Sequence, residues 1–232
     1  MVILITGTSS GIGRGLAERL AKVGHTILGC SRRLFPASIE GYRHFQVDLS
    51  LPDQVRRMFQ TIQGEYGFID ALINNAGTAV MNPFLLAPAS EIERIFRVNV
   101  FAVFHCSREA VKLMRYSKHE APSIINVSTV AVPWSIPGES IYASSKIAIE
   151  QAARTLSHEL ADFNIRVNTI GLPPVRTAMT RTVERSKIEA LIQRQALKRM
   201  CTIDDIIGPV EFLLSPAARF VTGSTLFLGG VC

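Results

Sequence analysis

Short hydrophobic runs alternate with amphipathic stretches along the whole of this chain. Seven runs of four to six residues predict β-strands: Val2–Thr6, His25–Cys30, Tyr42–Val47, Ile69–Ile73, Ser123–Ser128, Ile165–Ile170 and Thr225–Leu228. Stretches with apolar positions at helical spacing lie between them and predict α-helices: Arg14–Val23, Asp53–Tyr66, Ser90–Met114, Tyr142–Leu160 and Asp204–Leu214. Nearly continuous apolar strands separated by helices are typical of parallel strands buried on both faces.

This alternation predicts an α/β fold. Right-handed crossovers between successive strands give a doubly wound parallel sheet of about seven strands with helices on both faces, the Rossmann type. A length of 232 residues suits a single domain that spans residues 1–232. The stretch 177–200 is polar, charged and helix-prone, and it interrupts the strand–helix rhythm. Such an excursion predicts a lid over a functional site.

The first predicted strand ends in a glycine-rich turn, Thr6-Gly7-Thr8-Ser9-Ser10-Gly11-Ile12-Gly13, and a helix follows at about Arg14. Glycines let the backbone turn tightly and approach a pyrophosphate, and a helix N-terminus offers free N–H groups and a partial positive charge. The order strand, turn, helix predicts a dinucleotide site, with a turn that binds no ligand as the alternative. The expected phosphate contacts come from Gly7, Ser9, Ser10, Gly11, Ile12 and Gly13.

The spacing Gly-x-x-x-Gly-x-Gly resembles that of the short-chain dehydrogenases/reductases, and the resemblance extends over essentially the whole chain. Asn74-Asn75-Ala76-Gly77 is similar to the family's Asn-Asn-Ala-Gly motif, and Asn99 falls where the family has an Asn that kinks a helix. Tyr142-Ala143-Ser144-Ser145-Lys146 matches the family's Tyr-x-x-x-Lys. The general resemblance is to the 3-oxoacyl-carrier-protein reductase branch. It implies a nicotinamide-dependent oxidoreductase in which Asn75, Ala76 and Gly77 lie at the cofactor.

Tyr142 and Lys146 are four residues apart, so on a helix they share one face. A free tyrosine has a pKa of about 10, and an adjacent ammonium together with an oxidised nicotinamide is expected to lower it. Tyr142 then gives a proton to a carbonyl oxygen or takes one from an alcohol. The resemblance implies that Lys146 also binds the nicotinamide ribose and that Asn99 anchors a water of a proton relay. The alternative is an ordinary Tyr–Lys pair on a helix surface.

The family's third catalytic group is a serine at the end of the fifth strand, and this chain departs from the pattern there. Counting back from Tyr142, the family's spacing falls on Thr129, which carries the same hydroxyl donor on a stiffer side chain. Ser128, one residue earlier, is the alternative if the following loop carries a one-residue insertion. Neighbouring strand residues point to opposite faces, so only one of the two is expected to face substrate.

A second departure follows the sixth strand. Val175 and Thr177 hold the places that the resemblance assigns to nicotinamide contacts, but Leu172-Pro173 replaces the family's Pro-Gly. Proline cannot take the positive φ open to glycine, so a different loop path is expected.

The choice of dinucleotide depends on the end of the second strand. A carboxylate there would bind the ribose 2′-hydroxyl and select NAD, but the chain reads Ser31-Arg32-Arg33. Two guanidinium groups suit a 2′-phosphate, with Ser31 as a further donor, so NADP(H) is the expected cofactor and NAD(H) the alternative. Solvated surface charge is the other interpretation of the arginines. Asp48-Leu49 resembles the family's adenine-contacting segment, and Asp48 or Ser50 is also a candidate helix N-cap before Pro52.

Composition narrows the class of protein. The net charge of +6 does not predict a nucleic-acid or membrane partner, because the lysines and arginines are spread through the chain. The four cysteines form no C-x-x-C pair, which predicts reduced thiols and no metal site. The first apolar run is too short for a signal peptide or a membrane span, so a cytoplasmic protein is expected.

The substrate is expected to be a small, mainly apolar ketone or secondary alcohol, free or as a 3-oxoacyl thioester on a carrier protein or CoA. The expected pocket loops, residues 78–88, 130–141 and 178–195, are rich in apolar side chains and offer no fixed charge that indicates a sugar or an amino acid. The resemblance implies a homodimer or homotetramer packed through the helices Ser90–Met114 and Tyr142–Leu160. The alternatives are an NAD-dependent alcohol dehydrogenase and a non-catalytic dinucleotide sensor.

Overall fold

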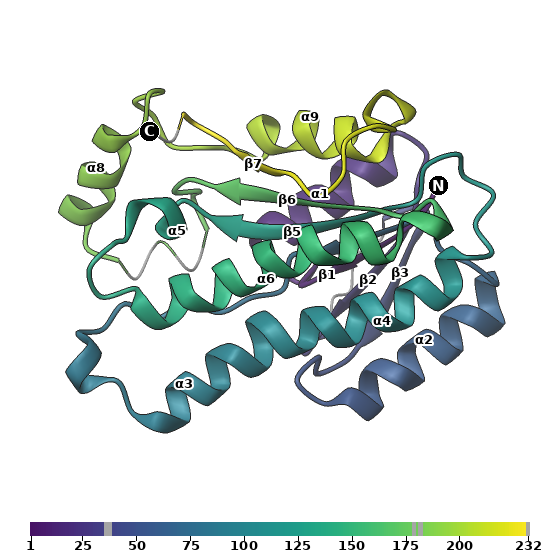
Figure 1. Ribbon diagram of the computed structural model, residues 1–232, viewed down its shortest axis with the longest axis horizontal. Coiled ribbons are helices and arrows are strands. Elements are labelled where there is room, and N and C mark those ends of the chain that lie inside the picture. Colours follow the sequence, from purple (N-terminus) through teal and green to yellow (C-terminus); the bar gives the residue numbers. More distant parts are fainter. Residues whose placement is uncertain (35–38, 178–179, 181–182, 231–232) are drawn as a thin grey trace.

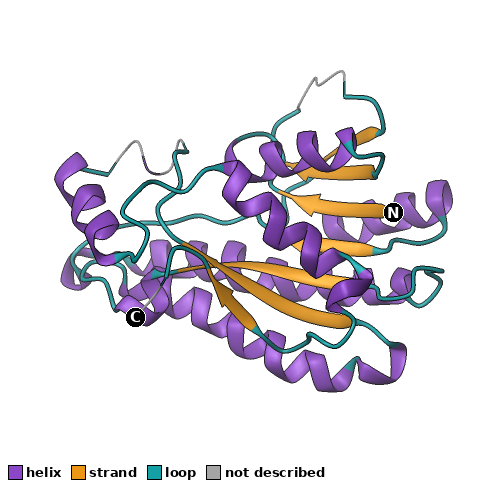
Figure 2. Ribbon diagram, turned by 90° about the horizontal axis from the view of Figure 1, so that it is seen from above, coloured by secondary structure: helices purple, strands orange, loops and turns teal. Residues whose placement is uncertain are grey.

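The structure, a computed structural model, describes residues 1–34, 39–177, 180 and 183–230. The strands within these residues form a seven-stranded sheet (Figures 1 and 2). The strand order is β3-β2-β1-β4-β5-β6-β7, and all neighbouring strands are parallel. The strands are β1 Val2–Thr6, β2 Thr26–Ser31, β3 Tyr42–Gln46, β4 Ala71–Asn74, β5 Ser123–Thr129, β6 Arg166–Leu172 and β7 Thr225–Phe227. The predicted doubly wound fold is confirmed.

Helices cover both faces of this sheet. The α-helices are α1 Gly11–Lys22, α2 Pro52–Tyr66, α3 Ala89–Phe96, α4 Ala102–Met114, α5 Ala131–Trp134, α6 Ser140–Glu159, α8 Arg185–Arg194 and α9 Ile203–Leu214. Short helical turns are η1 Phe84–Leu86, η2 Arg97–Phe101, η3 Ala161–Phe163 and η4 Pro216–Ala218. Figure 1 shows α2, α4 and α6 on one side of the sheet and α1 and α9 on the other. Among the described residues, no helix has the length and apolar character needed to cross a bilayer.

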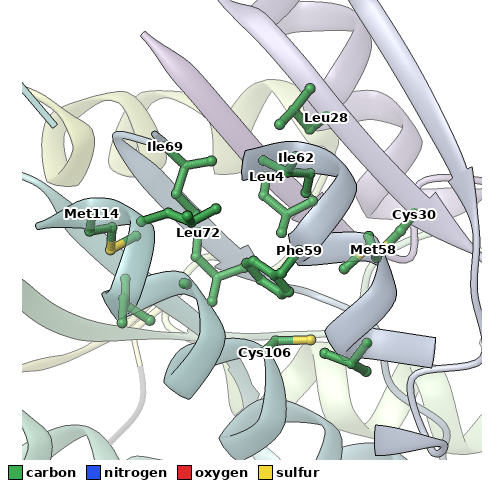
Figure 3. Close-up of a cluster of buried hydrophobic side chains, with 14 of the residues drawn as sticks. Leu4, Leu28, Cys30, Met58, Phe59, Ile62, Ile69, Leu72, Cys106 and Met114 are labelled. Atoms are coloured by element: carbon green, nitrogen blue, oxygen red, sulfur yellow. The ribbon is translucent and has the colours of Figure 1, made fainter. Parts of the chain in front are cut away.

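Two hydrophobic cores follow from these layers. Leu4 of β1 packs with α2 and α4 in the core of Figure 3, whereas Ile3 and Ile5 pack with α1 and α9 on the opposite face. Alternate residues of a strand point to opposite faces, so a strand between two helical layers needs apolar side chains at every position. This requirement explains the continuous apolar run at the start of the chain.

The first and the last long helices are neighbours although they are far apart in the sequence. Leu16 and Leu20 of α1 belong to the same core cluster as Ile206 and Val210 of α9. An exposed ion pair between Arg19 of α1 and an aspartate of α9 lies at the rim of this contact. The α9 helix therefore helps to hold the helix that begins at the glycine-rich turn.

The predicted helix Ser90–Met114 is interrupted in the structure. The chain forms α3, then a π-helical turn at Arg97–Phe101, then α4. Asn99 lies in the π-helical turn, where its side chain bonds the backbone of Thr78 at both the N–H and the carbonyl. A π-turn inside an α-helix frequently marks a functional position, because it redirects side chains without ending the helix.

The stretch 177–200 contains α8, which lies beyond the arrowheads of β5 and β6 beside α5 (Figure 1). Within this stretch, residues 178–179 and 181–182 lie outside the described part of the chain. The guanidinium of Arg194 lies 4.9 Å from the ring centroid of Trp134 and donates to the Trp134 carbonyl at 3.1 Å. The position of α8 at the carboxyl end of the strands fits the predicted lid, which stays a prediction.

Candidate active site

The candidate site lies at the carboxyl ends of β1, β4, β5 and β6. The chain winds outward in both directions from β1, which pairs with β2 on one side and β4 on the other. Such a switch in strand order opens a crevice in which α/β proteins bind ligands. The sequence-predicted residues come from loops that end here.

The glycine-rich turn after β1 is joined to the Asn-Asn-Ala-Gly segment after β4. The Asn75 amide donates to the Thr6 carbonyl at 2.9 Å, and the Thr6 hydroxyl accepts from the N–H of Ala76 at 2.9 Å. A Cβ atom on Gly13 would lie 2.4 Å from the Gly7 carbonyl oxygen and 2.5 Å from the Asn75 amide nitrogen. No side chain fits at position 13, because the Gly7 backbone and the Asn75 amide already fill the space beside it. The first N–H groups of α1 are available there for an anion.

Tyr142 and Lys146 lie on one face of α6, as their spacing predicts. The Lys146 ammonium lies 6.0 Å from the centroid of the Tyr142 ring and donates to the Val127 carbonyl at 2.7 Å. Lys146 is only 4% exposed. The ammonium is therefore fixed by a strand carbonyl at the end of β5, next to the hydroxyl-bearing residues.

The two candidate hydroxyls at the end of β5 have different partners. Thr129 lies close enough to Tyr142 for its hydroxyl to form a hydrogen bond that lowers the pKa of Tyr142. Ser128 is buried and donates to Oε1 of Glu150 at 2.5 Å, inside the layer between the sheet and α6. The structure brings Thr129 and not Ser128 to the tyrosine. A catalytic role for Thr129 stays a prediction.

Asn99 connects the π-helical turn to the catalytic helix. Its side chain is fully buried and donates to the Ser145 hydroxyl at 2.9 Å, in addition to its bonds with Thr78. A Cβ atom on Gly77 would lie 3.3 Å from the Lys146 nitrogen and 3.4 Å from Oδ1 of Asn99. Gly77, Asn99 and Lys146 therefore converge, as the family resemblance implies.

Burial dominates the electrostatics of this group. It raises the pKa of Tyr142 to about 12, an effect that Glu139 increases and the Thr129 hydrogen bond opposes. It lowers the pKa of Lys146 to about 8, against the attraction of Glu150. The expected lowering of the Tyr142 pKa includes the charge of an oxidised nicotinamide, and for the cofactor-bound protein it stays a prediction. The loss of hydration around the phenolate outweighs the favourable contacts.

The segment at the end of β2 is more open than the catalytic group. The side chains of Arg32 and Arg33 are exposed, whereas Ser31 is buried and its hydroxyl donates to the Arg33 carbonyl at 2.7 Å. Ser31 therefore holds the loop backbone, and its predicted role as a donor to the cofactor stays a prediction. Residues 35–38, which follow, lie outside the described part of the chain.

Asp48-Leu49 follows β3. Leu49 is buried, and the Asp48 carboxylate accepts from both the N–H and the hydroxyl of Ser50, at 2.9 and 2.7 Å. The N-cap of α2 is Leu51, with Pro52 in the first turn, so neither Asp48 nor Ser50 is the cap. The two polar residues form a local turn that places α2.

The segment after β6 reaches the glycine-rich turn from the other side of the crevice. A Cβ atom on Gly11 would lie 3.5 Å from Cγ2 of Thr177, and Val175 is buried in a bridge with Cys201. Leu172 continues β6 in register with Thr129. β6 therefore includes the first of the two residues that replace the family's Pro-Gly, and the different loop path expected from the sequence stays a prediction.

The predicted substrate loops also meet. The N–H of Asn82 donates to the Gly138 carbonyl at 3.0 Å, which joins the loop after β4 to the loop before α6. Glu150 and Glu139, which affect the pKa values above, were not among the sequence candidates. Glu150 follows Lys146 at helical spacing, and that signal alone marks it as a neighbour.

Fold and site together define a nicotinamide-dependent oxidoreductase. A family model described as "Enoyl-(Acyl carrier protein) reductase" matches residues 7–230, and the chain belongs to the short-chain dehydrogenase/reductase family. Members of this family act on CH–OH or carbonyl groups, and this chain is such an oxidoreductase.

Individual relatives cover nearly the whole chain. D-erythrulose reductase of Gallus gallus is 32% identical, over 98% of this chain and 93% of its own length. The ligand-free aldohexose dehydrogenase of Thermoplasma acidophilum superposes with a TM-score of 0.89 at 30% identity, over 99% and 93% of the two chains. A 3-ketoacyl-(acyl-carrier-protein) reductase from Brucella melitensis, complexed with NADH, gives a TM-score of 0.90 at 26% identity, over 98% and 96%.

Proposed function

We propose that this chain is an NADP(H)-dependent reductase of apolar ketones, working in reverse as a secondary-alcohol dehydrogenase, with Tyr142 as the proton donor and acceptor. The observation that carries the proposal is the convergence of Tyr142, Thr129 and Lys146 beside the Asn-Asn-Ala-Gly segment. The glycine-rich turn at the start of α1 supports a dinucleotide site, because Gly13 lets the turn pack tightly against Gly7 and Asn75 and the helix N-terminus offers free N–H groups to a pyrophosphate.

Proton transfer is the part of the reaction that the chain itself performs, while the bound nicotinamide supplies or accepts the hydride. With its pKa raised to about 12, Tyr142 is protonated at neutral pH and is ready to donate to a carbonyl oxygen. The Thr129 hydroxyl donates a second hydrogen bond to the same oxygen and stabilises the charge that develops on it. In the oxidative direction, the charge of Lys146 and of the oxidised cofactor favours the tyrosinate.

The preference for NADP(H) rests on the exposed pair Arg32 and Arg33 at the end of β2, where no acid stands to bind a free ribose hydroxyl. Charge-assisted bonds from guanidinium groups suit a phosphate at that position. NAD(H) is the second candidate, because solved relatives at 28% and 26% identity contain NADH.

The substrate is proposed to be a mainly apolar carbonyl compound, free or as a carrier- or CoA-linked 3-oxoacyl thioester. In support, the predicted pocket loop 130–141 carries the apolar Trp134, which is 5% exposed, and it is joined to the loop after β4 by the bond from Asn82 to Gly138. A homodimer or homotetramer is proposed through η2, α4 and α6, where Phe101, Phe104 and Ile147 are 51%, 45% and 41% exposed. Light scattering of the purified protein tests the assembly, and a monomer at micromolar concentration would contradict it.

The experiment that tests the function follows NADPH consumption with a panel of apolar ketones and 3-oxoacyl thioesters, with Tyr142→Phe as the paired variant. We expect turnover by the wild type and its loss in the variant, while both bind NADPH. NADPH binding without turnover of any carbonyl by the wild type would overturn the proposal in favour of a non-catalytic dinucleotide sensor.

A further inference from the structure

The edge strand β3 carries a row of polar side chains that the catalytic group does not use. Tyr42, His44 and Gln46 alternate with Arg43 and Phe45, so the three share one face of the strand. Among the described strands, β3 pairs only with β2, whose last residues lead into the arginine segment. The shared face therefore lies beside the segment proposed to read the 2′-phosphate.

A chain of hydrogen bonds runs along this face. The hydroxyls of Thr8 and Tyr42 are 2.8 Å apart, and the Tyr42 hydroxyl lies 2.7 Å from Nδ1 of His44. Nε2 of His44 lies 3.0 Å from the Arg33 carbonyl oxygen. The Gln46 side-chain amide donates to the carbonyl of Arg32, the residue before Arg33, at 3.1 Å. The glycine-rich turn is thus connected through β3 to the backbone of both arginines.

One arrangement of protons satisfies the whole chain. The Arg33 carbonyl can only accept, so Nε2 of His44 carries the hydrogen and Nδ1 accepts from the Tyr42 hydroxyl. The Tyr42 hydroxyl then accepts from Thr8. The Ser31 hydroxyl lies 3.2 Å from Nε2 of His44, so it can accept from the same N–H while it donates to the Arg33 carbonyl. The network therefore holds the loop backbone through more than one bond.

Position 29 of β2 shows that the network is built into the fold. A Cβ atom on Gly29 would lie 2.1 Å from the Tyr42 hydroxyl and 2.5 Å from the Thr8 hydroxyl. Any larger residue would separate these two hydroxyls. Gly29 therefore leaves the space in which the tyrosine reaches the glycine-rich turn.

From these contacts we infer that Tyr42, His44 and Gln46 are positioning residues that hold the Arg32–Arg33 backbone and thereby set the preference for a dinucleotide with a 2′-phosphate. The inference rests on the proposed use of NADP(H). Guanidinium groups bind a phosphate best in a fixed geometry, and a loop that is ordered before binding loses less entropy when it binds. The three residues act through the arginine backbone and not by touching the cofactor.

The test compares the dissociation constants of NADPH and NADH, measured by nicotinamide fluorescence, for the wild type and for variants of the shared face. In the double variant His44→Leu/Gln46→Leu we expect NADPH to bind about tenfold more weakly and NADH to bind within twofold of the wild type, a change of about 1.4 kcal/mol in selectivity. His44→Gln keeps a donor for the Arg33 carbonyl and is expected to retain most of the preference.

Two further variants make the result specific. Tyr42→Phe removes a single oxygen and is expected to reduce the NADPH preference two- to threefold with the strand intact, even if the double variant folds poorly. Arg43→Gln is the matched control, because Arg43 lies on the other face of β3 and pairs with Glu65 at 3.3 Å. The Arg43→Gln variant should prefer NADPH over NADH by the same factor as the wild type at physiological salt, because charges are screened beyond about 8 Å.

The possible results distinguish failure of this inference from failure of the proposed use of NADP(H). A wild type without a preference for NADPH would overturn the proposed cofactor and this inference with it. A wild type that prefers NADPH, with a ratio unchanged in Tyr42→Phe and in the double variant, would overturn only the inference. Equal weakening of NADPH and NADH binding would show a purely structural role and would also overturn it.

Discussion

The catalytic group on α6 and the arginine segment after β2 both lie at the carboxyl ends of the strands, but the first is buried and the second is exposed to solvent. Lys146 is 4% exposed and is held by a strand carbonyl, whereas Arg32 and Arg33 extend into solvent. Burial shifts the pKa of Lys146 to about 8. In the catalytic group, packing and desolvation decide the chemistry. In the arginine segment, charge acts through water and is screened by salt.

This difference predicts how each region responds to change. Removing one atom from the buried group changes a contact that water cannot replace, so large effects are expected. Removing one exposed charge weakens an interaction that the solvent already attenuates, so the effect is smaller and depends on ionic strength.

The largest effect is expected for Tyr142→Phe. Loss of the proton donor should lower kcat by about 10²- to 10⁴-fold, the usual contribution of general acid–base catalysis. Tyr116→Phe is the matched control, because Tyr116 is 67% exposed at the end of α4. Steady-state kinetics with NADPH in excess measure both variants. A Tyr142→Phe enzyme within tenfold of the wild type would contradict the assignment.

Next in size is the contrast between the two hydroxyls of β5. Thr129→Val keeps the shape but removes the donor, and it should lower kcat by about 10²- to 10³-fold, as expected for one lost oxyanion contact. Ser128→Ala should keep kcat within a few-fold but lower the free energy of unfolding by about 1–3 kcal/mol, because buried Glu150 loses a partner. Steady-state kinetics and urea unfolding of both variants show which hydroxyl is catalytic. A large loss of kcat in Ser128→Ala with little loss in Thr129→Val would place Ser128 in the site.

Burial of Lys146 predicts a stability effect that depends on pH. In the folded protein Lys146 releases its proton near pH 8, and in the unfolded chain near pH 10.5. At neutral pH both states are protonated and the folded state bears the full cost of burying the ammonium. Between pH 8 and 10.5 the unfolded chain binds more protons, so this group's contribution to stability rises with pH.

Lys146→Met should therefore be inactive yet more stable than the wild type at pH 7, by about 1–3 kcal/mol after the lost bond to Val127 is counted. The gain should shrink as the pH rises above 8. Denaturant unfolding of the wild type and the variant at pH 7 and pH 9.5 measures the difference between their free energies of unfolding. Titratable groups that both proteins share cancel in this difference. A variant that is less stable at pH 7 would show that the ammonium is not penalised by burial.

The smallest effect is expected in the exposed segment. Arg32→Gln/Arg33→Gln should weaken NADPH binding about tenfold, or about 1.4 kcal/mol, and leave NADH binding nearly unchanged. The difference between the two proteins should fall with added salt, because exposed charges are screened. Titrations at low and high salt measure it. A loss of affinity that salt does not change would mean that the arginines bind in a desolvated pocket.

Much of this molecule was predictable from its sequence. The run Val2–Ile5 predicts a strand buried on both faces, and the spacing between Tyr142 and Lys146 predicts a shared helix face; both are confirmed. These features were accessible because each depends on the period of a single regular element.

The features that escaped prediction depend on contacts between elements. The resemblance implied a kink at Asn99, but the periodicity of the stretch is that of one continuous helix, and the π-helical turn with its bonds to the Thr78 backbone was seen only in the structure. The burial that raises the pKa of Tyr142 in the chain alone was not predictable either, because depth of burial is a property of the whole fold. Ser31 looked like a ligand donor, but its bond to the Arg33 carbonyl forms only once the loop has turned.

The contact between α1 and α9 has a consequence for how the protein is made. A ribosome synthesises the glycine-rich turn and α1 well before α9, which packs with Leu16 and Leu20. Until residues 203–214 have left the exit tunnel, the apolar face of α1 can pack against β1 and β2 but lacks its partners Ile206 and Val210. Dinucleotide-binding competence should therefore arrive late in translation, and a chain released before α9 should expose an aggregation-prone surface.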